Sequence, residues 1–246
     1  MANILGVRFH NLSLAEVVSY VDKCVVNKQR AILAFSNPEF VVEAQSNPFL
    51  MDYLNNRVAV NVADGIGVVW AAGLSGQVLK ERVTGTDFVP SLMRMCAEHD
   101  HKIFFLGGKP GVAEQARDYF SRTLGKDVVV GVENGYFSED RNGDIVEKIN
   151  SSGAQVLMVC LGNPRQEKWI EKNLEILAPY VMFGNGGALD FWSGGVRRAP
   201  LWVQKVGFEW VFRLGQDFSL ARIRRQLKLL KFVKLFLQSM LFRSAK

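Results

Sequence analysis

The stretch that decides the fold is KIFFLGGKPGVAEQARDYFSRTL, residues 102–124. A short apolar run is followed by a glycine-rich turn, and the turn by a segment whose apolar residues recur at helical spacing. This order predicts a buried strand, a tight turn and an amphipathic helix. Repetition of such units builds a parallel β-sheet that is covered by helices.

The same order recurs along the chain. Apolar runs predict strands at 31–35, 58–63, 102–108, 127–132, 155–162 and 180–184, and helical spacing predicts helices at 39–54, 87–99, 111–124 and 165–177. We therefore expect an α/β fold, with a Rossmann-like, mostly parallel sheet and helices on both faces. This domain is expected over residues 1–200, and a C-terminal basic amphipathic helical appendage over residues 201–246.

Charge is concentrated at the C-terminal end. Residues 213–246 contain nine Lys or Arg and one acid, whereas the rest of the chain is close to neutral. Such a basic segment suggests a polyanionic partner, either nucleic acid or an anionic membrane.

Other features exclude several classes of protein. The N-terminus lacks the pattern of a signal peptide, and no run of apolar residues is long enough for a spanning helix, so we expect a cytoplasmic protein. Three scattered cysteines predict reduced thiols. The histidines, His10, His99 and His101, do not have the spacing of a familiar metal motif, so no metal ligand is assigned.

Polar and glycine-rich turns follow three of the predicted strands. They are Asn37-Pro38, the turn that begins at Gly107, and Gly162-Asn163-Pro164. An Asn-Pro pair often only caps a helix, and GGKPG is neither a dinucleotide fingerprint nor a Walker A motif. Ligands of such sheets nevertheless bind where the strands end, and helix N-termini attract phosphate. Together the turns predict a nucleotide pocket.

Asp64 is the single charge in NVADGIGVVW, residues 61–70. Burying a lone carboxylate is costly unless the group is paired or used. The carboxylate therefore either caps the turn at Gly65 or takes part in chemistry.

Three further polar clusters have both a structural and a functional interpretation. Gln166 fits a capping box with Asn163. Arg165 places a cation in the first helical turn, where it opposes the helix dipole, and a nearby anion would compensate for this. The segment 183–200 is a glycine-rich turn with one acid, Asp190, ahead of two arginines. The segment 81–88 contains Arg82 and either lines the pocket or forms a surface loop with a helix cap at Thr86 or Asp87.

Seven motifs in a fixed order resemble the WecG/TagA/CpsF family of bacterial glycosyltransferases. They are VADGIGVVWA, ERVTGTDF, FFLGGKPGVAEQA, GYF, LGNPRQEKWI, GNGGALDFWSGGVRRAP and GFEWVFRL. The resemblance implies an inverting enzyme that moves N-acetylmannosamine or its uronic acid from UDP to undecaprenyl-diphosphate-linked N-acetylglucosamine. Products of the family feed cell-surface polysaccharides.

The resemblance also implies roles for individual residues. Asp64 matches the proposed catalytic base, and Asn37 matches an asparagine of the active-site cleft. Nucleotide-sugar contacts are implied for Arg82, Tyr136, Gln166 and Asp190, and arginines of the C-terminal appendage are matched by Arg213, Arg222 and Arg225. From their place after strands we add Gly107, Gly186 and Gly187 to the expected substrate site.

One position departs from the family pattern. Phe35 stands where some members have a threonine near the base, so a hydroxyl that assists the base is in doubt here. The sequence also has no Asp-x-Asp metal clamp, and arginines and helix N-termini can stabilise a leaving diphosphate. We expect a metal-independent enzyme without a cofactor.

Two other functions are compatible with parts of the sequence. A nicotinamide-dependent oxidoreductase would need a glycine-rich dinucleotide turn after the first strand, where the sequence has SNPEF. A nucleic-acid-binding protein could use the basic tail, but that tail is also rich in Leu, Ile and Phe. We expect no nucleic acid partner.

The tail, residues 221–242, is amphipathic on a helical wheel. One sector holds Ile223, Leu227, Leu229, Leu230, Val233, Phe236, Leu237, Met240 and Leu241, and the cations lie opposite or at its edges. This pattern is typical of a helix in a membrane interface. A helix packed on the body, or a homo-oligomer contact, is the alternative. We expect a peripheral protein on the inner face of the cytoplasmic membrane, with the exact sugar, acceptor and oligomeric state left open.

Overall fold

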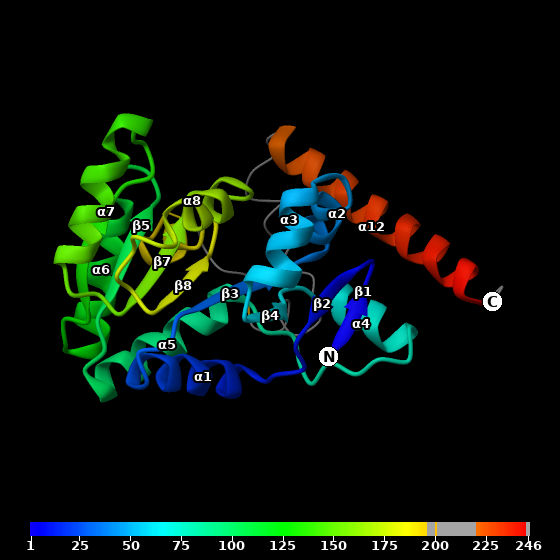
Figure 1. Cartoon of the computed structure of the whole chain (residues 1–246), viewed down its shortest axis with the longest axis horizontal. Coiled ribbons are helices and arrows are strands. Elements are labelled where there is room, and N and C mark those ends of the chain that lie inside the picture. The colour runs from blue at the N-terminus through cyan, green and yellow to red at the C-terminus, as the bar shows by residue number, and fades with distance from the viewer. Residues whose placement is uncertain (196–199, 201–219, 245–246) are drawn as a thin grey trace.

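The computed structural model describes residues 1–195, 200 and 220–244, with the side chains of residues 228–241 in the last segment (Figure 1). Its centre is a six-stranded sheet in which every pair of neighbours is parallel, in the order β4-β3-β8-β7-β5-β6. The strands are β3 (Ala31–Ser36), β4 (Val60–Ala63), β5 (Ile103–Gly107), β6 (Val129–Glu133), β7 (Val156–Cys160) and β8 (Val181–Gly184). All six predicted strands are confirmed.

Helices cover both faces of the sheet, as expected. Side chains alternate between two cores, so that Ile32 and Ala34 of β3 point to one face and Leu33 and Phe35 to the other. One face is covered by α1 (Leu14–Val26), α5 (Gly85–His99), α6 (Val112–Leu124) and α9 (Leu189–Trp192). The other is covered by α2 (Pro38–Ser46), α3 (Pro48–Asp52), α4 (Ile66–Leu74), α7 (Asn142–Ser151) and α8 (Arg165–Asn173).

An N-terminal hairpin was not predicted. Strands β1 (Ala2–Ile4) and β2 (Val7–Phe9) pair in an antiparallel manner through a turn at Leu5 and Gly6, which have φ of 51° and 82°. Val7 and Phe9 are fully buried. Three residues per strand are too few for an alternating pattern to stand out in the sequence. Two short turns of helix, η1 (Tyr53–Arg57) and η2 (Glu139–Arg141), complete the described elements of the domain.

Helix caps confirm one sequence interpretation and correct two. Asn37 caps α2, because its Oδ1 accepts from the Phe40 N–H at 2.8 Å. The cap of α8 is Pro164, without a side-chain hydrogen bond, so the predicted capping box of Asn163 and Gln166 is wrong. The cap of α5 is Thr84, and neither Thr86 nor Asp87.

The C-terminal helix α12 (Leu220–Ser244) packs across α2 (Figure 1). Phe232 and Phe236 are buried in the core on that face, and Lys228 forms an ion pair with Glu43 of α2. The wheel placed Phe236 in one continuous membrane-facing sector, and this part of the interpretation is wrong. The described apolar side chains divide between the body and an exposed row of Leu230, Val233, Leu237 and Leu241.

Candidate active site

The expected site residues gather where the strands of the sheet end, which we call the carboxyl edge. Because the six strands are parallel, their carboxyl ends lie on the same side. Arg82 joins this edge because the N–H of its neighbour Val83 donates to Ala63 O at 3.0 Å, at the end of β4. The other expected residues at or just beyond the strand ends are Asn37, Asp64, Gly107, Tyr136, Gln166, Gly186, Gly187 and Asp190.

Asp64 is half-buried in the tight turn between β4 and α4. Gly65 has φ of 139°, and a Cβ atom there would lie 3.0 Å from Pro38 Cδ, so glycine is required on both counts. A Cβ at Gly67 would lie 3.1 Å from Pro38 Cγ. These close approaches pack the turn of Asp64 against the turn of Asn37 and Pro38.

A hydrogen bond orients the Asp64 carboxylate itself. Its Oδ2 accepts from the Gly85 N–H at 3.3 Å, at the start of α5. Gly85 also accepts a hydrogen bond at 3.3 Å from Asn185 Nδ2, in the loop after β8, and a Cβ at Gly85 would collide with the Asn185 side chain. Asn185 was not among the expected site residues. The sequence feature that could have identified it is its position in the glycine-rich segment, directly after a strand.

Arg82 belongs to a small polar network at the start of α5. Its side chain is 19% exposed and lies 3.8 Å from the Asp87 carboxylate. Thr84 donates to Asp87 Oδ2 at 2.8 Å while it caps α5. Arg82 therefore lies in the loop that leads into α5, and its ion pair ties it to the capped start of that helix.

Gly107 and Tyr136 have contrasting surroundings. Gly107 has φ of 133°, and a Cβ there would lie 2.3 Å from Cys160 O, so this glycine allows β5 and β7 to approach each other. Tyr136 is 70% exposed in the loop after β6. The next residue, Phe137, lies under the Arg165 guanidinium at 5.3 Å, which gives Arg165 a partner other than the anion expected from the sequence.

Gln166 is 4% exposed, and both ends of its amide are hydrogen-bonded within the protein. Its Oε1 accepts from the Gly186 N–H at 2.9 Å, and its Nε2 donates to Glu167 Oε1 at 2.8 Å. A Cβ at Gly184 would lie 2.4 Å from Gln166 Nε2. Gln166 therefore holds the loop after β8 against the start of α8.

The loop after β8 presents an acid beside an open backbone. A Cβ at Gly187 would lie 3.3 Å from Asp190 Oδ2, whereas nothing lies within 4 Å of a Cβ at Gly186, which has φ of 47°. Asp190 is half-buried in the first turn of α9. This arrangement leaves room for a ligand to approach the backbone beside a carboxylate.

Glu167 is a buried acid to which the sequence analysis assigned no role. It is 3% exposed and lines a small cavity behind the carboxyl edge. Burial raises the pKa of its carboxyl to about 7. Turned with its nitrogen toward Glu167, the Asn163 amide donates to that carboxylate, 2.7 Å from Oε2. The cavity is also lined by Leu33, Ala34, Phe35, Phe40, Tyr53, Asn163, Gln166 and Gly184.

Phe35 lies in an aromatic cluster. Its ring is 4.8 Å from that of Phe88 and 5.9 Å from that of Phe183, which accounts for an apolar residue at this position. Of the expected arginines, Arg213 lies outside the described residues, as do Arg197 and Arg198. Arg222 and Arg225 lie in α12, but their side chains are not described.

The fold and this edge define a class of protein, a doubly wound α/β protein with polar, glycine-rich loops where its parallel strands end, which is where such sheets bind ligands. A family model described as "Glycosyl transferase WecG/TagA/CpsF family" matches residues 2–246. The chain is 30% identical over 226 residues to an N-acetylglucosaminyldiphosphoundecaprenol N-acetyl-beta-D-mannosaminyltransferase of Bacillus spizizenii, a match that covers 92% of this chain and 86% of that protein.

The chain belongs to the WecG/TagA/CpsF family of glycosyltransferases. It is therefore an enzyme that transfers a sugar, the function that the sequence favoured over the oxidoreductase and nucleic-acid-binding alternatives. Among the described residues, no helix has the length and apolar character needed to cross a membrane.

Proposed function

We propose that this enzyme transfers N-acetylmannosamine, its uronic acid or a related hexose from UDP to undecaprenyl-diphosphate-linked N-acetylglucosamine or a related lipid-linked saccharide, with inversion. The name of the Bacillus spizizenii relative supports this sugar and acceptor. The observation that carries the proposal is Asp64, a half-buried carboxylate at the carboxyl edge, oriented by the Gly85 N–H.

Asp64 acts as the general base. Its carboxylate takes the proton of the acceptor hydroxyl while that oxygen attacks the anomeric carbon of the donor sugar. The bond from that carbon to the diphosphate breaks on the opposite face, and UDP leaves with the bonding electrons. Asn37, in the turn packed against Asp64, borders the acceptor.

Charge and exposed backbone at the same edge suit the UDP group. Arg82 stabilises the leaving diphosphate, and the open backbone at Gly186 and Gly187 lets the nucleotide approach closely. Asp190 accepts from donor hydroxyl groups, and the exposed ring of Tyr136 provides a stacking face for uracil. No divalent metal is required in this mechanism.

The enzyme works on the membrane that holds its acceptor, and an exposed apolar surface supports this part of the proposal. The exposed row of α12 is flanked by the exposed Lys231 and Lys234. The end of α4 reaches the same helix, because Ser75 contacts Met240 Sδ at 3.8 Å. Further exposed apolar side chains on and after α4 are Trp70, Leu74 and Val78. Apolar side chains beside cations are typical of an interfacial surface on anionic lipid.

A donor screen tests the function. The full chain is incubated with a short-chain lipid diphosphate N-acetylglucosamine and each of several UDP-sugars, and products are identified by mass spectrometry. We expect transfer from UDP-N-acetylmannosamine or its uronic acid, with an inverted linkage. Transfer of another hexose alone would assign that hexose as the donor sugar in place of N-acetylmannosamine. An absence of transfer from every UDP-sugar would contradict the proposal.

A further inference from the structure

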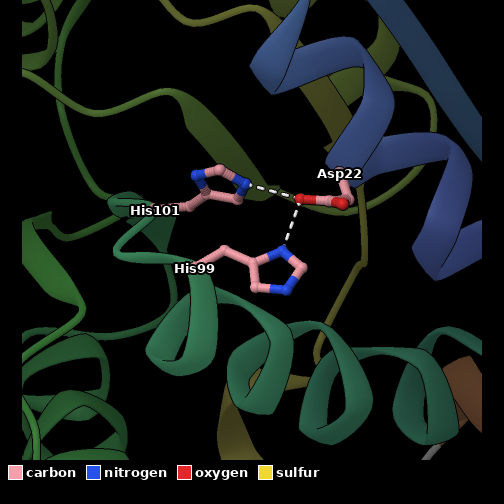
Figure 2. Close-up of side chains that lie close together, drawn as sticks. All are labelled: Asp22, His99 and His101. Atoms are coloured by element: carbon pink, nitrogen blue, oxygen red, sulfur yellow. Dashed lines mark hydrogen bonds and ion pairs between the residues drawn. The ribbon is translucent and has the colours of Figure 1, made fainter.

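Three side chains converge at the edge of the sheet opposite to Asp64: Asp22, His99 and His101 (Figure 2). His99 is the last residue of α5, and His101 comes two residues before β5 begins at Ile103. Asp22 lies in the last turns of α1, which leads into β3. The cluster is therefore at the amino ends of the strands and apart from the transferase site.

The donor atoms of the three side chains share one small space. Asp22 Oδ1 lies 2.7 Å from His99 Nδ1 and 2.8 Å from His101 Nε2, and the three atoms lie within 4.8 Å of one another. Asp100, between the histidines, has φ of 60°, and this turn aims both rings at the same carboxylate. Zinc binds imidazole nitrogen and carboxylate oxygen at about 2.0–2.2 Å, so small ring rotations would place the three donors around one ion.

The cluster is open to solvent on one side. The His99 side chain is 48% exposed and that of Asp22 24%, whereas that of His101 is 8% exposed. Asp22 and His99 line a groove between α1 and α5, together with Glu81, Glu98 and Arg94. An ion can therefore enter from the groove, whose carboxylates favour a cation, and water can fill the remaining coordination positions.

We propose that Asp22, His99 and His101 bind a divalent transition-metal ion such as zinc, at a site separate from the one that transfers sugar. Two imidazoles and a carboxylate suit zinc, nickel or copper better than the hard ions magnesium and calcium. The ion joins α1 to the turn between α5 and β5. It therefore stabilises the folded protein and leaves the transfer chemistry to the opposite edge.

Only two of the three proposed ligands are close together in the sequence. His99 and His101 are two residues apart, but the third ligand is more than seventy positions away in α1, so spacing along the chain did not predict a site. Among the described residues, this is the group of His, Cys, Asp and Glu whose ligand atoms converge in this way.

Calorimetric titration of zinc into the chelator-treated full chain tests the proposal. We expect one ion per chain, and affinity at least tenfold weaker in His99→Ala and in Asp22→Asn. His10→Asn and Glu98→Gln are matched controls that remove a histidine elsewhere and a non-ligand carboxylate of the groove, and both should bind as the unmodified chain does. Zinc at about a hundredfold excess over Kd should raise Tm by about 5 °C.

A spectroscopic measurement keeps the test independent of folding and of sugar transfer. Cobalt bound to the unmodified chain should give visible d–d bands without a thiolate band, and His101→Gln should lose them. Circular dichroism checks that each variant is folded, and chelator-treated Asp22→Asn should transfer sugar at the normal rate. The proposal would be overturned if the chain took up no stoichiometric metal, if the variants took up as much as the unmodified chain, or if a thiolate band appeared. The three side chains would then serve only to join α1 to the turn before β5 by hydrogen bonds.

Discussion

The Asp64 carboxylate accepts a hydrogen bond from the backbone N–H of Gly85, with 3.3 Å between Oδ2 and the nitrogen. Gly85 is the first residue of α5, where N–H groups have no partner within the helix. The contact joins the end of β4 to the start of α5 and sets the direction of the proposed base.

Asp64→Asn should abolish most of the transfer activity without unfolding the protein. Asparagine keeps the size of the side chain and an oxygen for the Gly85 N–H, but it cannot take a proton. We expect kcat to fall by roughly 10²–10⁴-fold, with UDP binding unchanged. Asp118→Asn, on the exposed surface of α6, is the control, and near-normal turnover of Asp64→Asn at saturating substrates would remove Asp64 from the role of base.

Gln166→Leu should loosen the loop after β8. The substitution leaves the Gly186 N–H without its acceptor, and an unsatisfied buried donor costs about 1–3 kcal/mol of unfolding free energy. We expect a raised KM for the UDP-sugar and a smaller effect on kcat, because Gln166 acts through the loop. Urea denaturation and steady-state kinetics measure both, with the exposed Gln115→Leu as control; unchanged stability and KM would refute the positioning role.

Glu167 should make stability depend on pH. Burial raises its pKa from 4.5 to about 7, so between these values the folded chain binds the proton more tightly than the unfolded chain does. The free energy of unfolding therefore falls as pH rises through this window, by about 3 kcal/mol in total.

Glu167→Gln should remove that dependence. The variant should gain stability relative to the unmodified chain as pH rises from 5 to about 8. Urea denaturation at several pH values measures the difference, and Glu147→Gln, an exposed carboxylate on α7, should show no such trend. Parallel stability curves for Glu167→Gln and the unmodified chain would show that Glu167 titrates normally.

UDP should stabilise the protein in the presence of a chelator. The proposed diphosphate site uses Arg82 and backbone groups, so Tm should rise with UDP without magnesium or manganese. Arg82→Gln should reduce this shift, whereas Arg122→Gln on the surface of α6 should not. A rise in Tm with UDP that occurs only when a divalent metal is added would contradict the metal-free mechanism.

The exposed row of α12 should govern membrane binding. Leu237→Asp with Leu241→Asp places two charges on this row and should abolish sedimentation with anionic vesicles. Gln238→Asp adds a charge at an exposed polar position of the same helix and should have a much smaller effect. Truncation after Gln216 should also abolish vesicle binding and most activity on the lipid-linked acceptor, and full activity of the truncated chain would refute both roles.

The elements of the sheet were predictable because their signals are local. Strands buried on both faces require continuous apolar runs, and all six runs proved to be strands. The position of Asp64 after one of them placed it at the carboxyl edge. Asn37 was recognisable as a cap because an Asn-Pro pair carries its own helix start.

Partners across the fold were not predictable from these patterns. The Gln166 Oε1 accepts from the Gly186 N–H, twenty residues away, and Pro164 caps α8 without a side-chain hydrogen bond. Arg165 lies over Phe137, and Phe236 faces the body although the wheel grouped it with Leu237, which is exposed. A helical wheel shows which residues share a face of a helix, but the surface that this face meets depends on where α2 lies.

The sequence by itself therefore determined the α/β class, the six strands, the edge that holds the polar residues and the glycosyltransferase family. The tertiary structure decided the strand order and the two surfaces of α12. It also decided the hydrogen bonds by which Gln166 holds the loop after β8, and those that join Asp22 to His99 and His101. The physical reason is that the periodic spacing of apolar residues and the capping of helices depend on residues only a few positions apart, so they can be recognised in the sequence. Hydrogen bonds between distant segments exist only once packing has brought those segments together.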